Sequence, residues 1–143
     1  MSSATVTWVQ NLQFVATDST RHSVVVSAQD DANGVGMKPS ELLLVSLAAC
    51  TAYDVANILH KKRKLLRQLR VEVAGEQHSA APWPFTRIHL HYVIAGENIS
   101  ERDIAQAIHL SHDKYCSVSA TLRQSVTLTH DYEFVDDGRA DGT

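Results

Sequence analysis

The sequence has little of what marks secreted, exported or nucleic-acid-binding proteins. Two cysteines in 143 residues are too few for a disulfide scaffold. A formal net charge of −3 gives no general attraction to phosphate backbones or anionic membranes. Residues 1–10 lack the basic start and apolar run of a signal peptide. We therefore predict a cytoplasmic protein without a nucleic-acid or membrane partner, in which the cysteines are either inert core thiols or a redox pair.

One apolar run, residues 42–59, is about long enough to cross a bilayer and precedes a basic cluster at residues 61–70. The run contains Asp54 and several other polar side chains, and a carboxylate inside a membrane is costly. The basic cluster is explained by cations that complement the C-terminal end of a helix dipole. The run therefore predicts a core helix rather than a membrane span.

Composition indicates a single domain. With 44% hydrophobic and 20% charged residues, the chain has the content of one compact soluble domain spanning residues 1–143. No repeat, low-complexity tract or linker divides it. The polar, glycine-containing residues 136–143 are expected to be a frayed tail.

The first half of the chain predicts strands followed by one long helix. Apolar residues mostly alternate over residues 5–28, which indicates short antiparallel strands, and residues 29–38 form a loop. Pro39 suits the first turn of a helix, which we expect to run to about Lys64. Its first three turns are apolar nearly all round, so burial on several sides is needed and a partner subunit is the natural cover.

The second half predicts two more strands, a helix, a helical turn and a last strand. Alternation over residues 69–73 and 88–94 indicates half-buried strands. Ser100 with Asp103 resembles a capping box at the start of a helix that ends near Cys116. A helical turn at residues 117–122 and a strand at residues 126–134 follow. This order of elements, without strict βαβ alternation, indicates the α+β class.

The two cysteines differ in their predicted surroundings. Cys50 lies in mid-helix among small residues, where a cysteine is most often a packed core thiol. Cys116 lies between two helical segments, where free backbone N–H groups can stabilise a thiolate. Asp54, one helical turn beyond Cys50, can face the same site, and its carboxylate would oppose a thiolate there.

Two segments carry a family resemblance. The segment KPSELLLVSLAAC, residues 38–50, and the segment YCSVSATL, residues 115–122, together resemble the paired cysteine motifs of the OsmC/Ohr family. The resemblance extends over almost the whole chain in the order of its elements. It implies an OsmC-like fold with antiparallel sheets packed around a long central helix, in an intertwined homodimer with active sites at the subunit interface.

The resemblance also implies a function, reduction of organic hydroperoxides in oxidative-stress defence. Carried onto this sequence, Cys50 is the peroxidatic residue and Cys116 the resolving residue, and an external dithiol reduces the disulfide between them. Arg21 is the only arginine in the early region where the family places the activating cation. Leu43, Leu47 and their neighbours are expected to line an apolar substrate site.

The local pattern is closer to the less characterised branch of the family. In the well-known peroxidases, a glutamate that orients the arginine follows the proline of the long helix. Ser40 takes that position here, and the acid is Glu41, a rotation of about 100° on a helix. The alternative function is a non-catalytic OsmC-fold dimer that binds an apolar small molecule at its interface.

Histidine pairs were the one place where the sequence suggested a metal ligand set. His89 and His91 share a strand face, and His109 and His112 lie one helical turn apart, but neither pair has a clear third ligand. We interpret both pairs as solvent-facing and predict neither a metal nor another cofactor.

Overall fold

The computed structural model describes residues 1–135 and divides into two compact units, Met1–Leu43 and a second unit that begins at Leu44. The predicted tail at residues 136–143 lies outside the described part of the chain. Helices and strands are mixed without βαβ alternation, so the predicted α+β class is confirmed.

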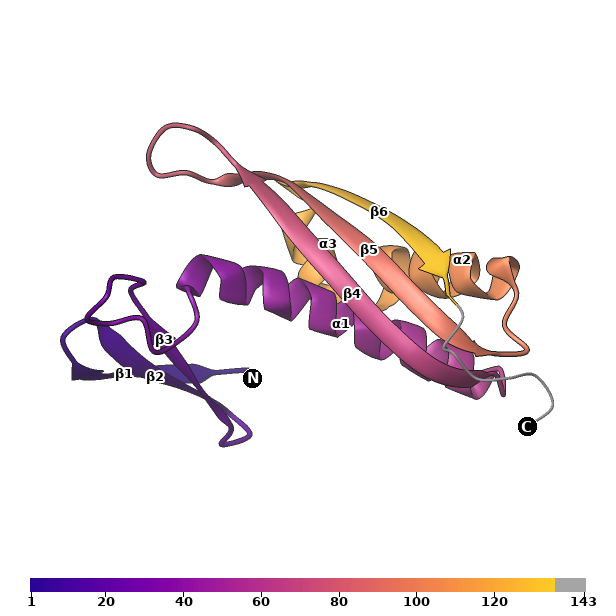
Figure 1. Cartoon of the computed structure of the whole chain (residues 1–143), viewed down its shortest axis with the longest axis horizontal. Coiled ribbons are helices and arrows are strands. Elements are labelled where there is room, and N and C mark those ends of the chain that lie inside the picture. The colour runs from indigo at the N-terminus through magenta and orange to yellow at the C-terminus, as the bar shows by residue number, and fades with distance from the viewer. Residues whose placement is uncertain (136–143) are drawn as a thin grey trace. The chain divides into compact units, whose positions relative to one another are not determined.

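The first unit is an antiparallel sheet of three strands, as the alternation predicted (Figure 1). The strands are β1 (Ala4–Gln10), β2 (Gln13–Asp18) and β3 (Ser23–Ser27). Asn11, with φ 48, makes the tight turn from β1 to β2, because asparagine tolerates the left-handed region better than most residues. Little of this sheet is buried: every residue of β1 is exposed, including Trp8 at 64%.

Helix α1 (Pro39–Lys61) begins at the predicted proline and ends before the predicted Lys64. It ends because Arg63 takes the left-handed conformation, with φ 58, and the Lys64 N–H bonds back to the Leu59 carbonyl, as in a Schellman motif. By length and composition α1 could cross a membrane. Its Leu47, Val55 and Leu59 side chains are instead fully buried in a core shared with strands and another helix.

The sheet of the second unit has the order β4-β5-β6, with strands β4 (Leu65–Gln77), β5 (Phe85–Glu97) and β6 (Thr127–Phe134). Strand β5 is antiparallel to β4, but β6 runs parallel to β5, which corrects the expectation of purely antiparallel sheets. The helical crossover between β5 and β6 returns the chain to the end of the sheet where β5 began, and this makes the pair parallel.

The core lies on one face of this sheet, where the helices pack (Figure 1). Alternate residues of β5 are fully buried. They pack with apolar residues of α1 and of α2 (Glu101–Leu110). The alternating, fully buried residues of β5 are Ile88, Leu90, Tyr92 and Ile94.

The connection from α2 to β6 contains two further helical segments, the π-helical η1 (Ser111–Tyr115) and α3 (Ser117–Leu122). Helix α2 begins where predicted, because Ser100 and Asp103 form the capping box, each side chain bonding the other's backbone N–H. Cys116 separates η1 from α3 and is the N-cap residue of α3. The predicted helical turn at residues 117–122 is confirmed.

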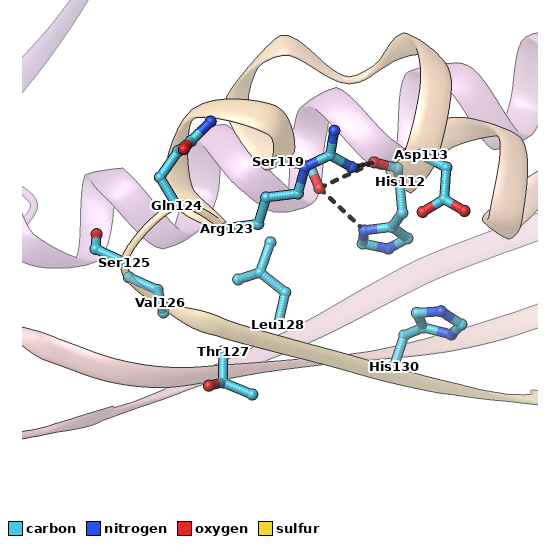
Figure 2. A pocket seen from close by; sticks show the side chains of 10 residues that line it. All are labelled: His112, Asp113, Ser119, Arg123, Gln124, Ser125, Val126, Thr127, Leu128 and His130. Atoms are coloured by element: carbon cyan, nitrogen blue, oxygen red, sulfur yellow. Dashed lines mark hydrogen bonds between the residues drawn. The ribbon is translucent and has the colours of Figure 1, made fainter.

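Several polar side chains are buried together beside the core, around His112 (Figure 2). Its Nε2 lies 2.8 Å from the Tyr92 hydroxyl, its Nδ1 lies 3.3 Å from Ser119 Oγ, and its ring stacks on His130 at 4.9 Å. Burial, followed by the neighbouring His130, lowers the pKa of His112 to about 4. The prediction of a solvent-facing His112 was wrong, because the π-helical turn directs this side chain into the protein.

Candidate functional site

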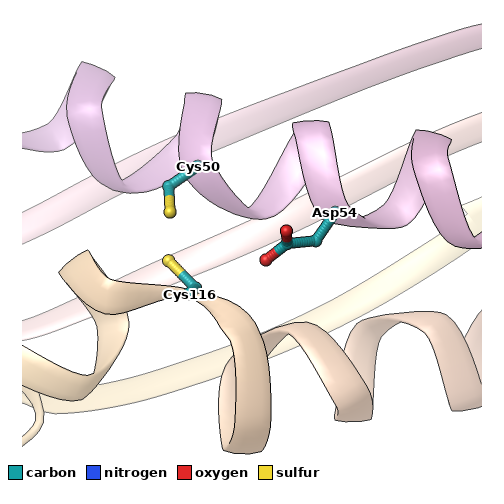
Figure 3. A group of neighbouring side chains, drawn as sticks. All are labelled: Cys50, Asp54 and Cys116. Carbon is teal, nitrogen blue, oxygen red and sulfur yellow. The ribbon is translucent and has the colours of Figure 1, made fainter.

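The structure brings together the two cysteines, which are far apart in the sequence. The Sγ atoms of Cys50 and Cys116 and a carboxylate oxygen of Asp54 all lie within 4.8 Å of one another (Figure 3). Both cysteines are free thiols. The three side chains converge from α1 and from the start of α3, so one small site holds two sulfur atoms and one carboxylate.

Local helical geometry places each of the three groups. Cys50 and Asp54 are one turn apart on α1 and therefore lie on the same face. Cys116 follows the π-helical turn, a type of irregularity that is frequent at functional sites. Cys50 is partly buried and Cys116 is only 2% exposed, so the first thiol is the more accessible one.

The Cys116 thiol is in a largely dry environment. The Ser119 N–H donates to its sulfur at 3.3 Å, which is the backbone stabilisation that the sequence predicted. Burial and the contact with the Cys50 thiol outweigh this hydrogen bond and raise the pKa of Cys116 to about 11. Cys116 is therefore a neutral thiol at physiological pH.

The Asp54 carboxylate faces the two sulfurs, as its spacing from Cys50 predicted. The Ser111 hydroxyl donates a hydrogen bond of 2.8 Å to its Oδ2. Ser111 is fully buried at the first residue of η1, so this contact fixes the orientation of the carboxylate. No sequence pattern pointed to a contact between Ser111 and Asp54, because the two residues are far apart along the chain and meet only through tertiary packing.

The hydroxyl of Tyr92 lies near the same site. Burial raises the pKa of Tyr92 to about 12, and the charges of Cys116 and Asp54 act in the same direction against a hydrogen bond with Thr51. Tyr92 is therefore a neutral hydrogen-bond donor or acceptor and not a phenolate. Thr51 is fully buried next to Cys50 and also bonds to the Ala48 carbonyl.

A pocket of about 350 Å³ opens beside Asp54. Three of its lining residues are aliphatic or aromatic, and the others are two lysines, an asparagine and Asp54 itself. The lining residues are Asp54, Asn57, Ile58, Lys61, Lys62, Leu110 and Tyr115. The predicted lining by Leu47 was wrong, because Leu47 has no exposed surface and belongs to the core.

The other two predicted site residues belong to the first unit. Arg21 is exposed in the turn between β2 and β3, has φ 68, and donates its backbone N–H to the Asp18 carbonyl. Glu41 is exposed in the first turn of α1. A role for either residue at the cysteines stays a prediction.

The two histidine pairs considered as metal ligands lie outside the cysteine site. His89 and His91 both bond the Asp131 carboxylate on β6, at 2.9 and 2.7 Å. The hydrogen bond of His91 to Asp131, followed by its hydrogen bond to Glu133, raises the pKa of His91. His109 is exposed and pairs with Asp113 at 3.0 Å.

Comparison with known proteins gives a consistent family. The model of the family described as "OsmC-like protein" matches residues 29–131. Protein YhfA of Escherichia coli K12 is 33% identical over 132 residues, which cover 92% of this chain and 97% of YhfA. This relative is similar along nearly its whole length.

Solved structures show the same fold. The OsmC-like protein of Mycoplasma pneumoniae has a TM-score of 0.81 at 20% identity, over 95% of this chain and 98% of that one. The organic hydroperoxide resistance protein OsmC of Legionella pneumophila has a TM-score of 0.67 at 13% identity, over 93% of this chain and 96% of that one. At these identities the likeness concerns the fold.

Proposed function

The chain belongs to the OsmC-like protein family, and from this premise we propose that it is a thiol-dependent peroxidase that reduces organic hydroperoxides in oxidative-stress defence. The observation that carries the proposal is the pair of free thiols whose sulfur atoms lie within 4.8 Å. Fold relatives include organic hydroperoxide resistance proteins. The proposal treats residues 1–143 as one OsmC-like domain, since the matching family model crosses the boundary between the two units.

In the first step the Cys50 thiolate attacks the terminal oxygen of the hydroperoxide. The O–O bond breaks, Cys50 becomes a sulfenic acid, and the leaving alkoxide takes a proton to form the alcohol. Cys50 is assigned this role because it is the more accessible of the two thiols. The pocket beside Asp54, with Ile58, Leu110 and Tyr115 in its lining, suits the organic part of the peroxide.

In the second step the Cys116 sulfur attacks the sulfenic sulfur of Cys50, a disulfide forms, and water leaves. A thiol with a pKa of about 11 must lose its proton during this attack. The Asp54 carboxylate is close enough to both sulfurs to accept this proton and pass it to the departing hydroxide, which leaves as water, and Ser111 holds the carboxylate in place. An external dithiol then restores both thiols by exchange.

We place the active form in a homodimer. Val45, Ala49 and Tyr53 follow one another at intervals of one turn on α1, and all three are exposed, Tyr53 at 70%. Such an apolar stripe on a core helix is typical of a surface that another subunit covers. Sedimentation should therefore give a dimer, and a Tyr53→Glu substitution should shift the protein to the monomer.

Peroxide consumption tests the function. The reduced protein with a dithiol should consume cumene hydroperoxide in repeated turnovers, and Cys50→Ser should abolish the reaction. Cys116→Ser should still react once but accumulate sulfinic and sulfonic acids at Cys50, which mass spectrometry detects. His109→Ala, an exposed residue outside the site, is the matched control and should keep full activity.

The proposal fails if the folded wild-type protein consumes no organic hydroperoxide with any dithiol. That result would favour the alternative, a non-catalytic dimer that binds an apolar small molecule. A pocket of about 350 Å³ is large enough for such a ligand. Arg21→Ala and Glu41→Gln test the remaining assigned residues: a fall in the rate of Cys50 oxidation, with the fold unchanged, is expected for each.

A further inference from the structure

We infer that the reduced dithiol site is also a zinc site, in which Cys50, Cys116 and Asp54 are the protein ligands. Two thiolates and one carboxylate are ligand types that Zn²⁺ binds in proteins. Their ligand atoms already lie within 4.8 Å of one another. This inference goes beyond the proposed function, because metal binding uses the sulfurs as ligands and involves no oxidation.

The geometry is close to what a tetrahedral ion requires. Zn–S bonds of about 2.3 Å and Zn–O bonds of about 2.0–2.2 Å set ligand atoms roughly 3.5–3.8 Å apart around the ion. Separations within 4.8 Å therefore need to close by about 1.3 Å at most. The two sulfur atoms point toward each other and the Asp54 carboxylate lies beside them (Figure 3), so small rotations about the side-chain bonds should supply a change of that size.

The surroundings of the ligands also fit a metal. The Ser111 hydroxyl donates to Asp54 Oδ2, and hydrogen bonds of this kind orient carboxylates that bind metal ions. The Ser119 N–H donates to the Cys116 sulfur, an interaction that stabilises a metal-bound thiolate. Both donors come from buried residues, so the ligands are held before any ion arrives.

The negative charge of the three deprotonated ligands favours binding of a divalent cation. A divalent ion would displace the thiol protons as it binds, and its charge would balance the two thiolates and the carboxylate that then surround it. Asp54 also lines the pocket of about 350 Å³, which leaves room for water or another small ligand at the fourth position. Zinc binding would thus hold both thiols in a protected form that organic peroxides do not oxidise.

The test is a Zn²⁺ titration of the reduced protein against a chromophoric chelator. We expect one ion per chain, a loss of affinity of more than about 100-fold in Cys50→Ser and in Asp54→Asn, and a loss of about 10–100-fold in Ser111→Ala. His91→Ala removes a half-buried histidine of β5 outside the site and should leave the affinity unchanged. Circular dichroism of each variant checks that the fold is kept.

Co²⁺ provides a second readout that does not depend on affinity. Bound through two thiolates in a tetrahedral site, it should give sulfur-to-metal charge-transfer absorption together with intense visible bands, and both should disappear in Cys116→Ser. Absent charge transfer, or equal Zn²⁺ affinity in the wild type and the cysteine variants, overturns the inference. Peroxide turnover measured with a chelator present tests the proposed function separately, so either proposal can fail while the other stands.

Discussion

The two compact units are stabilised in different ways. In the second unit, α1, β5 and α2 bury a continuous set of aliphatic side chains, many with no exposed surface. In residues 1–43, Val26 is the only buried apolar side chain, and polar groups fix the loops. Asp30 accepts hydrogen bonds from the backbone and side chain of Asn33, whose own Oδ1 accepts from the Leu12 N–H. Packing therefore specifies one unit, and local hydrogen bonds specify the other.

The largest effect is expected in the packed unit. Leu59→Ala removes a fully buried side chain of α1 and should lower the free energy of unfolding by about 2–5 kcal/mol, because it leaves a cavity in the core. Urea unfolding followed by circular dichroism measures this loss. A change below about 1 kcal/mol would mean that the second unit tolerates cavities and is not the better packed of the two.

Acid should destabilise the packed unit through its buried histidine. Unfolded His112 takes up a proton near its ordinary pKa of 6.5, whereas the folded protein does so only near pH 4. Between these values the unfolded state binds more protons, so stability is full above pH 6.5 and falls as the pH drops, with a slope that approaches ~1.4 kcal/mol per pH unit.

The variant His112→Gln isolates this contribution, since glutamine keeps a polar group but does not titrate. Thermal unfolding of both proteins from pH 7 to pH 4 should show a shallower loss in the variant. His130, whose pKa burial also lowers, contributes in the same direction and should leave a residual slope. Parallel curves for the two proteins would remove His112 as the acid-sensitive group.

The hydrogen-bonded unit should be sensitive at a polar residue instead. Asn33 is 6% exposed, and Asn33→Ala leaves the Leu12 N–H without its partner and removes the side-chain hydrogen bonds to the Asp30 carboxylate. We expect a loss of about 1–3 kcal/mol, expressed locally as faster amide exchange of the loop and of Leu12. If amide exchange stayed unchanged in the loop but became faster in β5, Asn33 would not be a residue that stabilises the first unit.

The smallest effect on stability is expected at an exposed valine of the first unit, which is compared with a buried valine of the second. Val6→Thr on exposed β1 should change the free energy of unfolding by less than about 0.5 kcal/mol, because that side chain is already in contact with solvent. The same substitution at Val55, which is fully buried in α1, places a hydroxyl in the core and should cost about 1–3 kcal/mol. Equal costs at the two positions would contradict the contrast in packing between the units.

Local patterns were enough to predict most of the elements. The capping box of Ser100 and Asp103, the start of α1 at Pro39 and the alternation in β5 each depend on neighbours within a few residues. The end of α1 and the direction of β6 were missed, because a left-handed Arg63 and a crossover path leave no periodic signal.

Some features of the candidate site could also be predicted from local patterns, and others could not. Helical spacing predicted that Asp54 faces Cys50, and the family motifs paired Cys50 with Cys116 before any distance was known. Ser111 and the buried position of His112 were not predictable, because both follow from the π-helical turn that precedes Cys116. That turn has no sequence period of its own.

By itself, the sequence determined the α+β order of elements, the family and the identity of the two thiols, since these depend on residue type and on spacing along one helix or strand. Only the tertiary structure decided that the two sulfurs and the Asp54 carboxylate meet within 4.8 Å, and that Cys116 is dry enough to stay protonated. Distances and burial arise when α1 and the segment from η1 to α3 pack on the same core, and packing is a property of the whole chain rather than of any segment.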